Sequence, residues 1–194
     1  MKSTLIVIPT RHEYRVFKKA LRPFTDTIPP HRILCSAPGK KSISAVKTSI
    51  VTKAPQRILL LGTAGALHSS LSSGTIILAS KIICAITKET SAIPVNATAP
   101  ISPITVLTSP TPLFRKAEKM KWSRIAQAVE MEGFYIAQLC KNYHIPFTMV
   151  RIIADDSGTG GFFNYMYRYT PCIQQLTAFV CSHFSELVQD ETIN

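Results

Sequence analysis

Acidic side chains are scarce in this chain, and four of them lie inside two short apolar segments. The chain has 11 acidic against 22 basic residues among its 194. Glu130 and Glu132 lie in the segment 129–133, and Asp155 and Asp156 end the segment 150–156. A carboxylate surrounded by apolar residues is costly to bury unless it is paired or used. The placement therefore indicates acid–base or charge-stabilising chemistry rather than solubility.

The elements that must position these acids follow from the hydrophobic pattern. We predict strands at 4–8, 57–61, 75–79, 82–87, 104–108, 125–129 and 147–154, and helices at 13–22, 42–53, 133–142 and 171–188. Apolar strands that alternate with amphipathic helices are typical of an α/β fold. We expect a single domain, 1–194, with a central mixed, mostly parallel β-sheet flanked by helices.

The candidate polar residues come just after the predicted strands. Glu13 follows the first strand, 63–65 the second, and Glu130, Glu132 and Asp155 come at or after the later ones. Ligands of α/β sheets bind at the carboxyl ends of the strands. The sequence therefore predicts that four separate segments converge on one edge of the sheet.

The net charge of +11 raises the possibility of a nucleic-acid partner, but its distribution argues against one. No aromatic residues interleave with the basic runs, as a base-stacking platform would need. The runs have the spacing of a solvated helix face, and they comprise Arg15, Lys18, Lys19 and Arg22, then Arg115, Lys116, Lys119, Lys121 and Arg124. We expect no nucleic acid among the partners.

The sequence lacks the motifs that indicate disulfide, zinc or nucleotide sites, secretion or a membrane span. The five cysteines form no Cys-x-x-Cys pair or zinc pattern, which favours reduced thiols and a cytoplasmic location. The apolar stretch 5–8 is too short for a signal peptide, and the longer stretches are broken by Gly62 and Lys81, so no membrane partner is expected. No Walker loop, Gly-x-Gly-x-x-Gly or Gly-x-Ser-x-Gly motif occurs, and we expect neither a cofactor nor a metal.

Four ordered motifs resemble one known family. They are Pro-Thr-Arg-His-Glu at 9–13, Leu-Gly-Thr-Ala-Gly-Ala at 61–66, Val-Glu-Met-Glu at 129–132 and Val-Arg-Ile-Ile-Ala-Asp at 150–155. The chain resembles the nucleoside phosphorylase superfamily and, within it, the nucleosidases for 5'-methylthioadenosine, S-adenosylhomocysteine and futalosine. The resemblance implies hydrolysis of the N-glycosidic bond between a purine and a 5'-substituted ribose, by a homodimer.

The resemblance also assigns roles to the site residues. Asp155 would protonate purine N7, Glu132 would bind the ribose hydroxyls, and Glu13 would activate the attacking water. The expected substrate-binding residues are Thr63, Ala64, Gly65, Glu130, Met131 and Arg151, with Phe114 or Leu113 stacking on the base.

Each acid also has a structural interpretation. Glu13 suits the first turn of a helix, and Glu130 and Glu132 could pair with Arg151 in a buried ion-pair network. An aspartate after a strand is often a helix N-cap, which fits Asp156 better than Asp155.

The sequence departs from the family pattern at three places. Ala154 replaces a serine beside the expected general acid, Gly-Thr-Ala-Gly-Ala replaces Ser-Ala-Gly-Gly, and the region 86–104 is short. A trimmed pocket wall favours a long 5' substituent, as in futalosine or aminodeoxyfutalosine of menaquinone biosynthesis, with methylthioadenosine and S-adenosylhomocysteine close behind. The alternatives are a phosphate-dependent phosphorylase, disfavoured because Glu13 would repel phosphate, and a non-catalytic purine-binding module.

Overall fold

The computed structural model describes residues 3–24, 28, 30–94, 100–113, 115–155 and 161–183, with the backbone alone at Pro30 and 161–167. Its helices are α1 (Arg11–Leu21), α2 (Ser42–Lys53), α3 (Lys116–Trp122), α4 (Gly133–Asn142) and α5 (Gly161–Ser182). Its strands are β1 (Thr4–Ile8), β2 (Ile33–Cys35), β3 (Arg57–Ala66), β4 (Ile76–Cys84), β5 (Thr90–Ala92), β6 (Pro103–Thr108), β7 (Ala128–Glu130) and β8 (Phe147–Asp155). Short 3₁₀ turns lie at Arg22–Phe24, Pro30–Arg32 and Gly39–Lys41.

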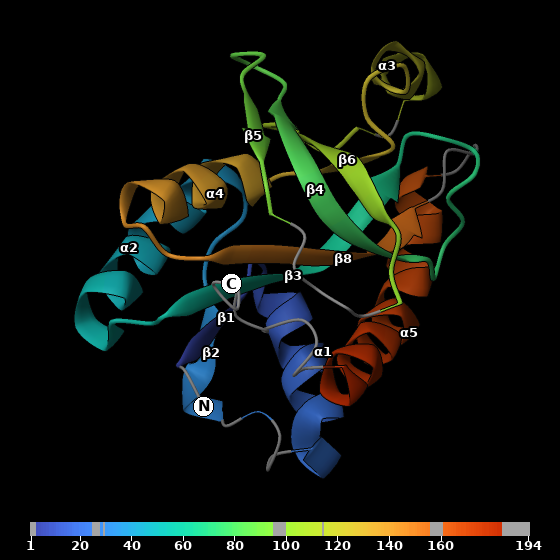
Figure 1. Cartoon of the computed structure of the whole chain (residues 1–194). Helices are drawn as coiled ribbons and strands as arrows, with labels where there is room; N and C mark the ends of the chain where they lie inside the picture. Colours follow the sequence, from blue (N-terminus) through green and yellow to red (C-terminus); the bar gives the residue numbers. More distant parts are fainter. Residues whose placement is uncertain are drawn as a thin grey trace.

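The described strands form one mixed sheet (Figure 1). Parallel pairs join β1 to β2 and β3, β3 to β8, and β6 to β4 and β7. Antiparallel pairs join β3 to β7, and β4 to β5 and β8. The pairings β3–β8–β4–β6–β7–β3 therefore close into a ring. Next to this ring, β1 pairs with β3 and β2 pairs with β1. The predicted α/β class with a mixed, mostly parallel sheet is confirmed.

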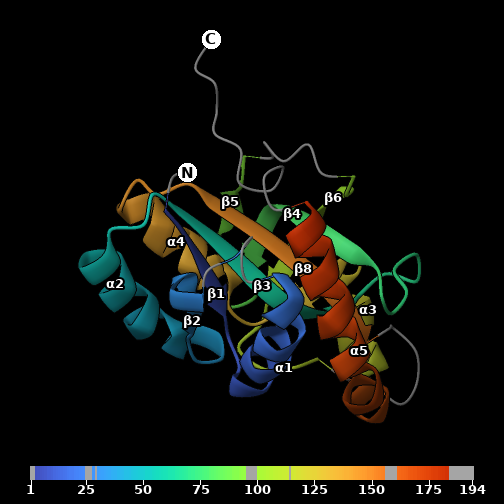
Figure 2. The ribbon, with the colours of Figure 1, turned by 90° about the horizontal axis from the view of Figure 1, so that it is seen from below.

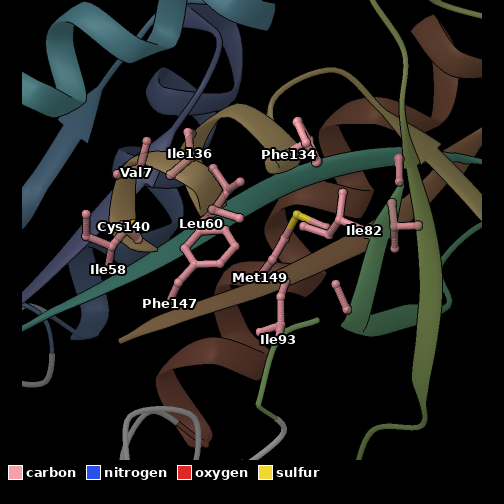
Figure 3. Packing of buried hydrophobic residues seen from close by; sticks show 14 of the residues in the cluster. Val7, Ile58, Leu60, Ile82, Ile93, Phe134, Ile136, Cys140, Phe147 and Met149 are labelled. Atoms are coloured by element: carbon pink, nitrogen blue, oxygen red, sulfur yellow. The ribbon is translucent and has the colours of Figure 1, made fainter. Parts of the chain in front are cut away.

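Helices cover both faces of the strands because consecutive strand residues point to opposite sides (Figure 2). Leu60 and Met149 pack in one cluster with residues of α2 and α4. Leu59 and Val150 pack in the other with residues of α1 and α5. Figure 3 shows the first cluster, in which Phe134 of α4 lies beside the central strands. The strands are therefore packed between two layers of helices.

Several predicted boundaries are confirmed and others are wrong. The strand 4–8 and the helices 42–53 and 133–142 are found as predicted. The predicted strands 75–79 and 82–87 are one strand, β4, whose pairing with β6 shifts register between Ala79 and Lys81. The predicted strand 125–129 is displaced to β7, and the first helix begins at Arg11 rather than at Glu13. The elements β2, β5 and α3 were not predicted.

The last helix begins ten residues earlier than predicted. The predicted helix 171–188 has Pro171 at its start, where the missing N–H group of proline costs no helical hydrogen bond. In the structure Pro171 lies inside α5, which runs from Gly161 to Ser182. Buried contacts of Cys172, Ile173 and Leu176 hold the helix against the sheet on the C-terminal side of this proline. The predicted residues 184–188 lie outside the described part of the chain.

Within the described residues, no helix combines the length and apolar character needed to cross a bilayer.

Candidate active site

A cavity of about 250 Å³ lies at the edge of the sheet where the predicted segments meet. The loop before α1, the end of β3, the loop after β6, the β7–α4 junction and the end of β8 all contribute to it. The described lining residues are Thr10, Glu13, Pro38, Thr63, Ala64, Gly65, Thr111, Pro112, Leu113, Val129, Glu130, Met131, Glu132 and Asp155. The structure therefore brings together four sequence segments that the motifs singled out.

Glu13 is buried in the first turn of α1 and accepts hydrogen bonds on both carboxylate oxygens. Its Oε2 accepts from Thr10 N at 3.2 Å and Thr10 Oγ1 at 2.9 Å, and Thr10 Oγ1 in turn accepts from Glu13 N. This reciprocal pattern is a capping box, which satisfies free donors at the helix start. Its Oε1 accepts from Thr63 N at 2.9 Å and Thr63 Oγ1 at 3.0 Å. The helix cap and the β3 strand together fix this carboxylate at the cavity wall.

A second group of acids lies at the β7–α4 junction around Arg151 of β8. Arg151 Nη2 donates to Glu130 Oε2 at 2.6 Å and to Glu132 Oε2 at 3.1 Å. Glu130 also accepts from the hydroxyl of Thr108 and from the backbone N–H groups of Glu132 and Gly133. Arg151 itself does not line the cavity and is 1% exposed. It contacts Glu130 and Glu132, which do line the cavity. These contacts form the buried ion-pair network that is the structural interpretation of the two glutamates.

Glu132 has fewer partners than Glu130. Its Oε1 accepts from the backbone N–H of Gly39 at 2.8 Å, and its Oε2 accepts from Arg151. Burial raises the pKa of Glu132, the charge of Arg151 lowers it, and Glu130 raises it, with a net pKa of about 7. Glu132 is thus a cavity carboxyl group that changes charge near neutral pH. Burial disfavours the charge of Arg151, but Glu130, Glu132 and Glu13 outweigh this effect and raise its pKa.

Asp155 ends β8 and pairs with Lys119, a lysine whose spacing predicts a place on a solvated helix face. Lys119 Nζ of α3 donates to Asp155 Oδ2 at 2.6 Å, and the two residues are 1% and 3% exposed. The interpretation of Lys119 as part of a solvated face is therefore wrong. Its neighbours Lys116 and Lys121 on the same helix are exposed, as expected. Charge spacing alone carries no signal that separates Lys119 from them.

Two glycines let the charged groups approach the strand β3. Gly62 has φ +151°, and a Cβ there would meet Arg151 Nη1 and lie 3.0 Å from Glu13 Oε1. A Cβ on Gly65 would lie 3.3 Å from Asp155 Oδ2 and 3.4 Å from Val129 Cγ1. The contacts of these Cβ atoms with Arg151, Glu13 and Asp155 would be tighter than ordinary packing. The absence of a side chain leaves room for Arg151 and Glu13 beside Gly62 and for Asp155 beside Gly65.

The remaining predicted residues are also located. Thr63, Ala64, Gly65 and Met131 line the cavity, as does Leu113, one of the two candidates for base stacking. The other candidate, Phe114, lies outside the described residues, as does Asp156. Ala154, which replaces the family's serine, is fully buried in the cluster that faces α1 and α5. In the described part of the chain, no three His, Cys, Asp or Glu side chains are grouped as metal ligands would be.

The fold and this site define a class of proteins. The model of the phosphorylase superfamily matches residues 84–181, which is half of the chain. The chain belongs to this superfamily. No curated protein matches it in a sequence search.

Solved structures with the same fold cover nearly the whole chain. A 5'-methylthioadenosine/S-adenosylhomocysteine nucleosidase (MTAN) of Campylobacter jejuni is 18% identical, with a TM-score of 0.79, and the match covers 96% of this chain and 100% of that one. A mutant of Helicobacter pylori MTAN with 5'-methylthioadenosine in its active site has a TM-score of 0.82 at 18% identity, with coverage of 96% and 100%. Futalosine hydrolase of Helicobacter pylori has a TM-score of 0.78 at 17% identity, with coverage of 96% and 98%. At these identities the likeness shows the fold.

Proposed function

We propose that the protein is a purine nucleosidase that hydrolyses the N-glycosidic bond of a 5'-substituted adenine or hypoxanthine nucleoside. The observation that carries this proposal is the convergence of Glu13, Glu132 and Asp155 on one cavity from three distant segments. N-glycosidic hydrolysis requires a proton for the leaving base, stabilisation of a positively charged sugar and a base for water. A set of three separate carboxyl groups suits these three tasks.

We assign one task to each carboxyl group. Asp155 would protonate purine N7, and Glu132 would accept hydrogen bonds from the ribose hydroxyls. Glu13 would take a proton from the attacking water. Two of its four donors are the hydroxyls of Thr10 and Thr63, which can rotate to other acceptors, whereas the two backbone donors stay fixed. Thr10 Oγ1 already lies 3.2 Å from Tyr169 Oη, so rotation can open a place on Glu13 for water.

The lining of the cavity favours water over phosphate as the nucleophile. Among the described lining residues four are acidic, and none is a lysine or an arginine. Phosphate needs cationic groups or backbone N–H donors that face the reacting carbon. Arg11, which follows Thr10 at the start of α1, is exposed and is not among the lining residues. These features support hydrolysis and disfavour the phosphorylase alternative.

The 5' substituent is the finer part of the proposal. The short region 86–104 and the Pro-Thr-x-x-Glu opening favour futalosine or aminodeoxyfutalosine, which would place the enzyme in menaquinone biosynthesis. The structural likeness to an MTAN and to a futalosine hydrolase supports a substrate from one of these two groups. Methylthioadenosine and S-adenosylhomocysteine therefore remain in the proposed range.

A chromatographic assay for free purine tests the proposal. The wild type is incubated with aminodeoxyfutalosine, methylthioadenosine, S-adenosylhomocysteine and adenosine, each with and without phosphate. Purine released from a 5'-substituted compound in phosphate-free buffer is the expected result, and the ranking of rates identifies the 5' group. A strict need for phosphate would instead indicate a phosphorylase. Binding of adenine without cleavage of any compound would indicate a purine-binding module.

The variant Asp155→Asn separates binding from chemistry in the same assay. It should retain adenine binding and lose roughly 10²- to 10⁴-fold in turnover, as expected for the removal of a general acid. The matched control is Glu118→Gln, an exposed acid on α3. Turnover by Asp155→Asn equal to that of the control would contradict the assigned role.

A further inference from the structure

The contact between Lys119 and Asp155 is unusual for a residue of a short surface helix. α3 spans only seven residues, and the other described charged residues on it, Lys116, Glu118 and Lys121, are exposed. Lys119 alone among these four turns inward, and its Nζ lies 2.6 Å from Asp155 Oδ2 with a side-chain exposure of 2%. Lysine is almost never fully buried unless it is paired. Asp155 is therefore a partner of this buried ammonium group.

The pair has a consequence for proton transfer. An ammonium group at hydrogen-bond distance favours the ionised form of a carboxyl group, and an ionised carboxylate carries no proton to donate. The purine must nevertheless receive a proton at the end of the cavity that Asp155 lines. Lys119 Nζ carries such a proton within hydrogen-bond distance of that carboxylate. Because desolvation disfavours separate charges, moving a proton within the pair to give two neutral groups is less costly here than in water.

We propose that Lys119 is a positioning residue that holds Asp155 and supplies the proton that Asp155 passes to the leaving purine. The inference rests on the proposed function and deepens it, since it makes the acid a lysine–aspartate pair in place of a single carboxyl group. Lys119 acts through Asp155 because it is not among the residues that line the cavity.

The proton and electron balance of the step is complete. The glycosidic C–N bond breaks, and its electron pair goes to the purine. Purine N7 takes a proton from the Asp155 carboxyl group, which has received one from the Lys119 ammonium group. The water oxygen bonds to the anomeric carbon, and the water gives a proton to Glu13. Lys119 then regains a proton and Glu13 loses one through solvent, so the net reaction consumes only water.

Turnover of the purine nucleoside that the wild type cleaves fastest, followed over pH, tests the inference. The variants are Lys119→Met, which keeps the aliphatic stem, and Lys119→Gln, which keeps a hydrogen-bond donor without a transferable proton. Lys116→Met is the exposed control on the same helix. Both Lys119 variants should lose about tenfold or more in kcat near pH 8 with a smaller change in KM. The alkaline limb of kcat should also move to lower pH, because a carboxyl group alone releases its proton at lower pH than an ammonium group does.

The double variant Lys119→Met/Asp155→Asn shows whether the two residues act as one unit. Its kcat should equal that of Asp155→Asn, since residues that act together give non-additive losses. A second substrate, 4-nitrophenyl 5-methylthioribofuranoside, has a leaving group that needs no proton. The Lys119 variants should cleave it within about threefold of the wild-type rate, because only the acid step has been removed.

The outcomes separate the inference from the proposed function. A wild type that releases no purine contradicts the proposed function and the inference with it. With an active wild type, a normal pH profile in Lys119→Gln overturns the inference, because hydrogen bonding alone would then suffice. Parallel losses on the purine and nitrophenyl substrates overturn it as well, since they show a merely structural role for Lys119.

Discussion

Arg151 Nη2 and Glu130 Oε2 are 2.6 Å apart, and both side chains are 1% exposed. The same nitrogen also reaches Glu132, so one guanidinium group compensates two buried carboxyl groups at the cavity. Arg151 Nη1 donates in addition to the carbonyl of Leu61 at 3.2 Å. The ion pairs therefore connect β8, β3 and the β7–α4 junction. This network is what holds Glu132 at the cavity wall.

Removal of Arg151 should destabilise the fold strongly. Arg151→Met leaves Glu130 and Glu132 buried without their cation, and breaking a buried pair in this way costs about 3–5 kcal/mol. Urea unfolding followed by circular dichroism measures the loss. The control Arg15→Met removes an exposed arginine of α1 and should change stability by less than about 0.5 kcal/mol. Equal stabilities for the two variants would show that the network does not support the fold.

Substitutions at the two glycines of β3 should have unequal costs. In Gly62→Ala the new Cβ meets Arg151 Nη1, and its φ of +151° is one that side chains rarely adopt. We expect a loss of about 2–4 kcal/mol from strain and from displacement of the buried guanidinium group. In Gly65→Ala the nearest atoms are 3.3 Å and 3.4 Å away, so the loss in stability should be smaller. Thermal unfolding compares them, and a Gly62→Ala protein as stable as Gly65→Ala would contradict the geometry.

The raised pKa of Glu132 predicts a pH dependence of stability. The folded protein retains the Glu132 proton up to about pH 7, whereas an unperturbed glutamate has a pKa of 4.5. Between these values the folded state binds more protons than the unfolded chain, so the free energy of unfolding falls as pH rises. The stabilising contribution of Glu132 is fully present below the pKa of the unfolded chain. It is lost as pH rises through the pKa of the folded protein, at about 1.4 kcal/mol per pKa unit.

Glu132→Gln tests this pH dependence because it removes the titrating group and leaves Arg151 paired with Glu130. From about pH 5 to about pH 8 the wild type should lose more stability than the variant does. Urea unfolding over this range measures both proteins. Parallel curves for the two proteins would mean that Glu132 does not titrate with a raised pKa.

The sequence predicts most of the framework because its signals are local. The apolar run of β1 and the periodic apolar residues of α4 give their bounds directly. The placement of Glu13, Glu132 and Asp155 on one cavity follows from the general rule that sites form at strand ends. The start of α1 was also readable, since Thr10-x-x-Glu13 is a capping-box pattern and the helix begins just after Thr10.

The rest depends on contacts between distant residues. The strands β2 and β5 have three residues each and form through their pairing with β1 and β4. The helix α3 is too short to show a hydrophobic period. Lys119 has the same local surroundings in sequence as its exposed neighbours, but it is buried and pairs with Asp155, 36 residues further along the chain. Side-chain pairing of this kind leaves no local pattern.

Glu13 has a structural and a proposed chemical role, and the variant Glu13→Gln distinguishes them. Glutamine keeps one acceptor oxygen, so it can retain the bonds to Thr10 or those to Thr63 but not both. Loss of one set should cost about 0.5–2 kcal/mol, as for a helix cap. Loss of the base for water should lower kcat by roughly 10²- to 10⁴-fold.

The control Glu118→Gln, also in the first turn of a helix but exposed, should change neither the stability nor kcat. Purine release and urea unfolding are measured on the same preparations. A folded Glu13→Gln protein with wild-type turnover would leave Glu13 with the capping role alone.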